Sequence, residues 1–225
     1  GVFIDEQQVS NLEKKMAERG YLEGSEMGTT FNMLRSNDLI WSYVVSNYLK
    51  GKEPAAFDLL HWNGDVTNLP ARWHMSYLKD LYRDNKLARP DALSADGTPI
   101  DLTRIETPAY IQAGREDHIA PAASVWRLMD HLRGPKTFVL AGSGHIAGVV
   151  NPPAAGKYQY WTNPEPVASL EDFVAGAKET PGSWWPHWRE WIKGKSGELK
   201  PAPAKLGSRK YRPLAPAPGT YVMER

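Results

Sequence analysis

The stretch from 108 to 142 reads PAYIQAGREDHIAPAASVWRLMDHLRGPKTFVLAG, and it decides the fold class. The apolar runs at 108–114 and 136–142 are bounded by Pro and Gly, which is typical of buried strands. Between them a helix of about a dozen residues is predicted to begin at Pro121 and to stop before Gly134 and Pro135. Strand, helix and strand in this order form a βαβ unit. We therefore predict an α/β fold with a parallel sheet and a right-handed crossover.

A parallel sheet is buried on both faces, and two or three strands do not achieve this by themselves. The chain also begins at Gly1 without an initiator Met, a charged leader or a cleavage site. We therefore expect the missing strands to precede Gly1 and the 225 residues to be a piece of a longer protein.

The sequence before this unit has mostly helical periodicity. Helices are predicted over 6–18, with Asp5 as N-cap and Gly20 ending it, and over the stretch that holds Met27 and Leu34. Two more are predicted at 38–49 and from Pro70 towards Pro90. In the 38–49 helix, the side chains expected to face inward are Leu39, Ile40, Tyr43, Val44 and Leu49.

The sequence after this unit is predicted to hold a polar loop beyond Asn151, a helix over 169–178 and a tryptophan-rich helix from Ser183. Trp184, Trp188 and Trp191 recur at i, i+4 and i+7, which predicts one face packed on the sheet. The domains expected are a mostly helical region at 1–92, which the family resemblance described below implies is a lid, an α/β core at 93–199 and an extended proline-rich tail at 200–225.

Composition excludes several classes of function. The net charge is +1, which gives no basic field for nucleic acid, and no window is long and apolar enough to span a membrane. The chain has no cysteine, so it supplies no disulfide, cysteine–zinc site or thiol nucleophile. The six histidines show no metal-ligand spacing, and we expect no metal and no cofactor.

The two strands of the βαβ unit are each followed by a loop with acid–base potential. Asp117 follows the first strand in the sequence REDHI, and His145 follows the second in GSGHIAG. Carboxyl ends of neighbouring parallel strands meet at one edge of a sheet, where ligand sites gather. We therefore expect Asp117 to accept a hydrogen bond from His145, as the acid and base of a nucleophilic triad do.

Each residue taken alone has a plainer interpretation. An Asp in such a loop is more often a helix cap, and a His in a glycine-rich turn is more often incidental; their joint placement favours catalysis. Acid before base, with the His last, is the order of α/β-hydrolases. No G-x-S-x-G or G-x-C-x-G elbow is present, so the nucleophile is expected before Gly1.

Several motifs together resemble class I polyhydroxyalkanoate synthases, in order and across essentially the whole chain. They are FDLLHWNGDVTNLP at 57–70, RSNDLIWSYVVSNYL at 35–49, REDHI at 115–119, GSGHIAGVVNPP at 142–153, GSWWP at 182–186 and PAPGTYV at 216–222. The resemblance implies an α/β-hydrolase fold with a helical lid, and a cysteine in a G-x-C-x-G elbow. The implied reaction transfers 3-hydroxyacyl groups, such as 3-hydroxybutyryl, from coenzyme A to a growing polyester.

The resemblance also assigns roles to individual residues. Asp117 matches the acid and His145 the base, and the adjacent His118 matches a histidine that supports catalysis. Trp62 and Asp65 are expected near the junction of lid and core, close to the substrate tunnel, although Asn63-Gly64 alone indicates only a turn. The implied partners are 3-hydroxyacyl-CoA, the polyester chain, the upstream part of the enzyme and a second subunit through the lid. The implied location is the cytoplasm, at polyester granules.

Two other functions remain open from the residues. One is an esterase or depolymerase with a serine elbow upstream, and the other is a non-catalytic piece that binds polyester granules or a partner through its aromatic side chains. The nucleophile elbow upstream of this chain distinguishes the three functions. A cysteine in the elbow indicates the synthase, a serine indicates the hydrolase, and the absence of both indicates the binding piece.

Overall fold

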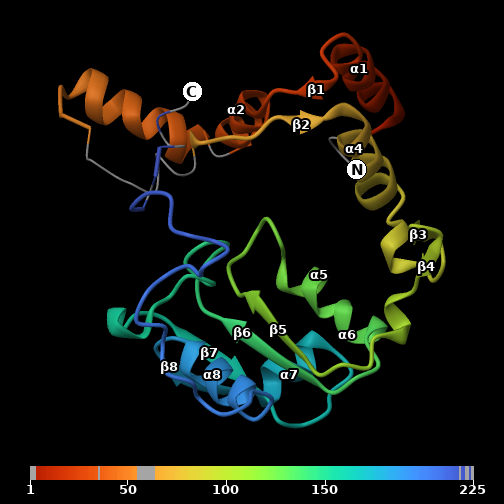
Figure 1. Cartoon of the computed structure of the whole chain (residues 1–225), viewed down its shortest axis with the longest axis vertical. Coiled ribbons are helices and arrows are strands. Elements are labelled where there is room, and N and C mark those ends of the chain that lie inside the picture. Colours follow the sequence, from red (N-terminus) through yellow and green to blue (C-terminus); the bar gives the residue numbers. More distant parts are fainter. Residues whose placement is uncertain (1–3, 35, 55–63, 218, 221–222, 224–225) are drawn as a thin grey trace. The chain divides into compact units, whose positions relative to one another are not determined.

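A computed structural model describes residues 4–34, 36–54, 64–217, 219, 220 and 223 (Figure 1). The chain forms two compact units. One comprises Gly1–Ala109 with Arg127–Lys136, and the other comprises Tyr110–Trp126 with Thr137–Arg225.

The sheet has the strand order β5-β6-β7-β8, with β5 at Ala109–Gly114 and β6 at Lys136–Ala141. The amide of Ala109 donates to the carbonyl of Pro135, and the amide of Arg115 donates to the carbonyl of Ala141, each over 2.8 Å. Both bonds join residues with the same separation in sequence, which is the signature of parallel strands. The predicted strands and their parallel pairing are therefore confirmed.

The connection between these strands is helical, as predicted, but it is broken at Arg127. It consists of α5 at Ala122–Trp126 and α6 at Leu128–His131. Glycine is required just after it, because a Cβ on Gly134 would lie 2.3 Å from the carbonyl oxygen of Glu106. The crossover thus turns back towards β6 with its backbone in close contact with the segment before β5.

Two further strands lie where a polar loop and the end of a helix were predicted. β7 (Gln159–Thr162) pairs antiparallel with β6, and β8 (Lys178–Pro181) pairs antiparallel with β7. The predicted helix at 169–178 is shorter: α7 spans Leu170–Gly176, with Ser169 as its N-cap. The prediction of a polar loop was wrong, because β7 is too short to stand out as a strand in the sequence. The prediction of a longer helix was also wrong, because β8 is a polar, mostly exposed edge strand and lacks the apolar alternation that would indicate a strand.

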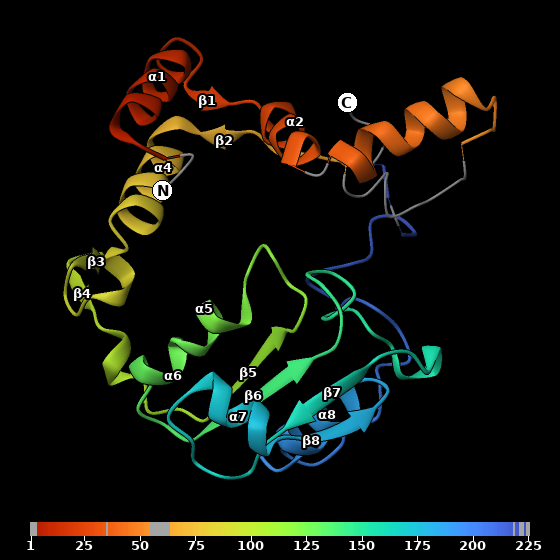
Figure 2. The same ribbon diagram turned by 180° about the vertical axis from the view of Figure 1, so that it is seen from behind.

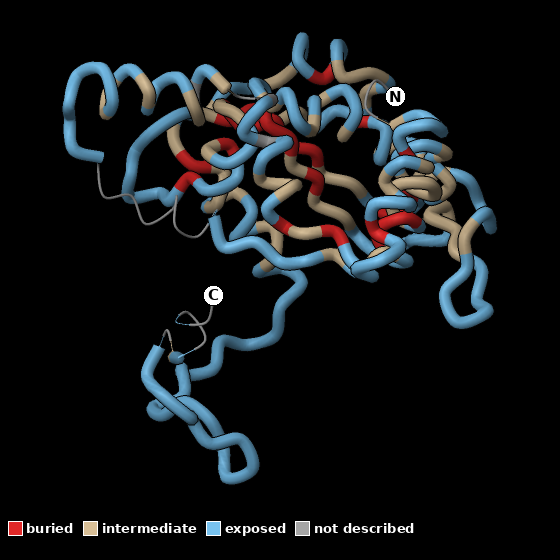
Figure 3. Tube along the Cα trace, turned by 90° about the horizontal axis from the view of Figure 1, so that it is seen from above, coloured by how far each residue is buried: buried red, intermediate tan, exposed pale blue. Residues whose placement is uncertain are grey.

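Helices cover both faces of this sheet (Figures 1 and 2). On one face Phe138 of β6 meets Trp126 of α5 and Phe173 of α7, with ring centroids 4.8 and 5.0 Å away. The opposite face carries α8 (Trp185–Lys193). Figure 3 colours the buried residues red, and those of β5 and β6 include Ile111, Ala113 and the run Phe138, Val139, Leu140 and Ala141. These two strands are thus packed into the interior and position the loops that leave them.

Phe173→Ala is expected to lower the free energy of unfolding by about 3–5 kcal/mol. The side chain is 2% exposed and contacts both Trp126 and Phe138, so its loss leaves a cavity that the sheet cannot close. Denaturant unfolding of the protein measures this. Val174→Ala is the matched control, because the neighbouring Val174 is 47% exposed; an equal loss in both variants would contradict the assigned core.

The tryptophan-rich helix packs on the sheet, as predicted, but with a different face. Trp184 and Trp191 lie against Tyr110 of β5, with ring centroids 6.0 and 5.4 Å apart. His187, whose Nδ1 lies 2.9 Å from the Tyr110 hydroxyl, completes this face. Trp188 is 41% exposed, so the prediction that it shares the buried face was wrong. The i, i+3, i+7 positions face the sheet here, and the i+4 position rotates outward.

The first unit begins with α1 (Glu6–Ala17), whose N-cap is Asp5 as predicted, and Gln8 completes a capping box with it. Gly20 follows the end of this helix, and its amide donates to the carbonyl of Met16 over 2.8 Å. Its φ is +76°, a conformation that favours glycine. β1 (Tyr21–Leu22) pairs with β2 (Leu69–Pro70), and α2 spans Gly24–Leu34 and α4 Ala71–Ser76. A small core of buried side chains joins these elements: Val9, Met16, Leu22 and Met75.

The predicted helix at 38–49 is helical but not inward-facing throughout. It forms two π-helical stretches, Asn37–Trp41 and Val44–Leu49, and Tyr43 and Leu49 are 40% and 68% exposed. The prediction for Leu49 and Tyr43 was therefore wrong: i→i+5 winding shifts side chains around the axis relative to the 3.6-residue period. A further π-helical stretch, Tyr77–Arg83, follows α4.

The remaining elements are short. β3 (Leu93–Ala95) and β4 (Thr98–Ile100) form a hairpin whose turn residues Asp96 and Gly97 both have positive φ. The 3₁₀ turns are Lys86–Ala88, Leu102–Arg104 and Pro153–Ala155. Residues 200–217 form no helix or strand and are exposed. None of the helices in the described residues is long and apolar enough to cross a membrane.

Candidate acid–base site

Asp117 lies in the turn that follows β5, and backbone groups hold its carboxylate. Its amide donates to the carbonyl of Gly114 over 3.3 Å. Its Oδ1 accepts the backbone N–H groups of Ile119 and Ala120 over 2.9 and 2.8 Å. The side chain is only 7% exposed. One carboxylate oxygen is thus fixed by the loop itself, and the other is left to a second partner.

That second partner is His145, in the loop that follows β6. Its Nδ1 lies 2.8 Å from Oδ2 of Asp117, across 28 positions of sequence. The imidazole is 47% exposed, whereas the carboxylate is buried. The predicted hydrogen bond between the two residues is therefore present in the structure; their catalytic role stays a prediction.

The environment keeps the carboxylate ionised. Burial raises the pKa of Asp117, but hydrogen bonds from Ala120, His145 and Ile119 outweigh it, so the pKa lies below its usual value. An ionised carboxylate only accepts hydrogen bonds, so the proton in the pair belongs to Nδ1 of His145. Nε2 is then the ring nitrogen with a free lone pair, which is the tautomer a general base needs.

Glycines allow the two loops to approach each other. A Cβ on Gly114, at the end of β5, would lie 3.0 Å from Cβ of Asp117 and 3.2 Å from the carbonyl oxygen of Ser143. A Cβ on Gly148 would lie 2.6 Å from the carbonyl oxygen of Gly144. The amide of Glu116 donates to the carbonyl of Ser143 over 3.1 Å, which ties the loops together. Sequence reasoning did not single out Gly114; its only signal is a Gly directly before the acid motif.

The other predicted site residues have no such geometry. Trp62 lies outside the described residues. Asp65 is exposed and belongs to the first compact unit, and His118 is exposed beside Asp117. Neither has a hydrogen bond or ion pair within the part of the chain that is described. Among those residues, no group of three or more His, Asp or Glu could hold a metal ion.

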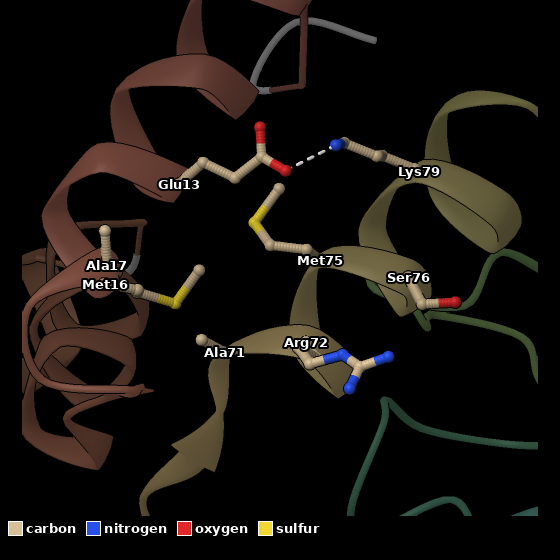
Figure 4. A pocket seen from close by; sticks show the side chains of 8 residues that line it. All are labelled: Glu13, Met16, Ala17, Ala71, Arg72, Met75, Ser76 and Lys79. Atoms are coloured by element: carbon tan, nitrogen blue, oxygen red, sulfur yellow. Dashed lines mark hydrogen bonds and ion pairs between the residues drawn. The ribbon is translucent and has the colours of Figure 1, made fainter.

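A pocket of about 350 Å³ lies elsewhere, between α1 and α4 (Figure 4). Met16 and Met75 form part of its lining, and the ion pair of Glu13 and Lys79 lies beside them. All of its lining residues belong to the first unit, and none is a predicted site residue. The pocket is therefore not part of the acid–base site.

Comparison with known proteins agrees with this geometry. Residues 13–152 match the family model described as alpha/beta hydrolase fold, which is more than half of the chain. The chain belongs to the alpha/beta hydrolase fold family. The predicted α/β-hydrolase class is thereby confirmed.

The more specific relatives are polymerases. The chain is 48% identical over 224 residues to the poly(3-hydroxyalkanoate) polymerase subunit PhaC of Rhizobium meliloti, matching 100% of this chain and 36% of the relative. It is 47% identical to the same subunit of Cupriavidus necator, over 98% of this chain and 38% of the relative. It is 50% identical to the poly(3-hydroxyalkanoate) polymerase of Methylorubrum extorquens, over 98% and 36%. The predicted resemblance is confirmed, and the chain spans little more than a third of these relatives' length.

Proposed function

We propose that this chain carries the acid and base of a poly(3-hydroxyalkanoate) polymerase. The observation that carries the proposal is the pair formed by Asp117 and His145, which lies at the ends of two parallel strands and has one ring nitrogen left free. Relatives at 47–50% identity bear that polymerase name, which supplies the substrate class.

The pair would serve two proton transfers. In loading, Nε2 of His145 takes the proton of a thiol, the thiolate attacks the acyl-CoA thioester, and coenzyme A leaves with that proton. In elongation, Nε2 takes the proton of a 3-hydroxyl group, whose oxygen attacks a second thioester to form the ester and release a thiol. No cysteine occurs among these 225 residues, so the proposed thiol belongs to another part of the polymerase.

The remaining expectations are part of the same proposal. His118 would support the pair from the acid loop, and Trp62 and Asp65 would lie near the substrate path. No cofactor is required, because the thioester itself supplies the activated acyl group. The enzyme would work in the cytoplasm, where soluble acyl-CoA meets the surface of an insoluble polyester granule.

The test compares the intact protein with the chain 1–225 alone. The intact protein is expected to release coenzyme A from 3-hydroxybutyryl-CoA and to make polymer, and the chain alone neither, because it has no thiol to carry the acyl group. Thiol release and polymer mass are measured together, with heat-treated protein as control. Free 3-hydroxybutyrate as the main product would indicate a hydrolase instead, and turnover by the chain alone would contradict a cysteine nucleophile.

The proposed lid would also form the contact between subunits. Apolar side chains gather on the helical stretch 37–49, and Trp41, Tyr48 and Leu49 are 56%, 84% and 68% exposed. An apolar surface of this kind is expected to be covered by another protein surface. We propose a second copy of the enzyme as that surface.

Ile40→Asp in the intact enzyme is expected to weaken dimerisation at least about 10-fold, because a carboxylate at an apolar contact loses its hydration without gaining a partner. Sedimentation at several concentrations measures the dimer fraction. Asn37→Asp is the matched control, since it adds the same charge at an exposed polar position of the same stretch. Unchanged sedimentation and rate for Ile40→Asp would show that this face is neither an interface nor a gate.

A further inference from the structure

The loop that carries His145 is held by two neighbouring tryptophans. Nε1 of Trp184 donates to the carbonyl of Gly148, and Nε1 of Trp185 donates to the carbonyl of Val149, each over 2.9 Å. These are successive carbonyls, 36 residues before their donors in the sequence. Two consecutive indoles thus bind two consecutive peptide groups of one loop.

The carbonyls of Gly148 and Val149 belong to a compact turn whose sequence includes His145. The amide of Gly148 donates to the carbonyl of Gly144 over 2.8 Å, and the amides of Val149 and Val150 donate to the carbonyl of Ile146 over 3.0 and 2.8 Å. These bonds join residues 144–150 into one turn. A bond that fixes the end of this turn also fixes the backbone that carries the imidazole.

The start of the loop is fixed by the sheet. The amide of Gly142 donates to the carbonyl of Gln159 in β7 over 2.7 Å. Between this bond and the indole bonds, the loop has no regular secondary structure, and His145 is 47% exposed. The position of the imidazole on Asp117 therefore depends on the bond from the Glu116 amide to the Ser143 carbonyl and on how well the far end of the loop is held.

The tryptophans are themselves anchored to the sheet. The Trp184 ring stacks on Tyr110 of β5, with centroids 6.0 Å apart, and the Tyr110 hydroxyl lies 2.9 Å from Nδ1 of His187. The amide of Trp185 donates to Oγ of Ser183, a residue only 8% exposed. Trp184 is thus attached to β5, the same strand that leads to Asp117, and Trp185 is held beside it by the buried Ser183.

We infer that Trp184 and Trp185 are positioning residues for His145, acting through the carbonyls of Gly148 and Val149 to hold the imidazole on Asp117. This inference rests on the proposed function, because it assigns the two indoles a part in the same acid–base step. Buried indole N–H groups usually find a partner, but here both partners lie in the one loop that carries the base.

The test replaces each tryptophan with phenylalanine in the intact polymerase, which removes the N–H and keeps an aromatic ring. The kcat for polymer formation is expected to fall about 5-fold for each variant, the loss typical of one hydrogen bond, with KM unchanged. Amide hydrogen exchange in 144–150 is expected to quicken in both variants. Trp188→Phe is the matched control, because Trp188 lies on the same helix, is 41% exposed, and its indole N–H has no hydrogen bond within the described residues.

A double-variant comparison separates positioning from general stability. In an Asp117→Asn background the phenylalanine substitutions are expected to lower kcat less than 2-fold, because the contact that they would loosen no longer holds the imidazole in its working tautomer. An equal loss in both backgrounds, or an unchanged kcat in the parent, overturns the inference. Trp185→Phe decides the question if Trp184→Phe disturbs packing on Tyr110.

The same experiment distinguishes failure of the inference from failure of the proposed function. His145→Ala is included as a reference. If it leaves activity intact, the proposed function is wrong and the inference with it. If it abolishes activity while both phenylalanine variants remain fully active, only the inference is wrong.

Discussion

Replacing His145 with alanine in the intact polymerase is expected to lower polymer formation by about 10³-fold, within the range found for loss of a general base. The structure leaves Nε2 of His145 as the ring nitrogen with a free lone pair, because Nδ1 is bound to Asp117 over 2.8 Å. Both proposed steps, loading of the thiol and attack by the 3-hydroxyl, use that lone pair, and polymer formation cannot proceed without the second. Alanine removes it from both, so coenzyme A release and polymer mass should fall together.

His131→Ala is the matched control for this variant. His131 is half-buried in α6, and its imidazole has no hydrogen bond or ion pair within the described ranges, so its loss should leave the rate within about 2-fold of the parent. Circular dichroism and sedimentation establish that both variants are folded. A His145→Ala enzyme with more than a tenth of the parent activity would contradict the assignment of the base.

The parallel strands could be predicted because their residues carry the signal locally. Both β5 and β6 are continuous apolar runs with Pro or Gly at their ends, and burial on both faces requires that composition. β7 and β8 carry no such run. Their pairing is determined by strands elsewhere in the sheet, which a short polar segment such as Lys178–Pro181 does not reveal.

The acid–base pair could be predicted for a topological reason. Once two strands are parallel neighbours, the loops after them meet at one sheet edge, whatever the details of packing. The supporting residues depend on those details. Gly114 matters because a Cβ there would crowd the Asp117 side chain and the backbone of Ser143. Trp184 and Trp185 matter because of the carbonyls that their indole N–H groups reach. The helical periodicity of 183–192 indicated only that tryptophans would pack on the sheet.

Asp117→Asn is expected to lower the rate of elongation much more than the rate of loading. Oδ1 of Asp117 accepts two backbone N–H groups, so the asparagine oxygen should take that place and its amide nitrogen should face His145. An amide N–H donates, so Nδ1 would have to accept and the proton would move to Nε2. The working nitrogen of the base is then blocked. In serine proteases the corresponding change lowers the rate about 10⁴-fold.

The two nucleophiles should respond differently to a misdirected base. A cysteine thiol has a pKa of about 8.5, so some thiolate exists near neutrality without help. A 3-hydroxyl group is far less acidic and needs the base to lose its proton. Asp117→Asn should therefore still load an acyl group onto the thiol, within about 10-fold of the parent rate, while elongation falls about 10³-fold or more. Rapid-quench trapping of the acyl-enzyme, measured beside polymer yield, compares the two steps. Asp130→Asn, an exposed carboxylate in α6, is the control, and equal losses in loading and elongation would show that the imidazole serves both steps alike.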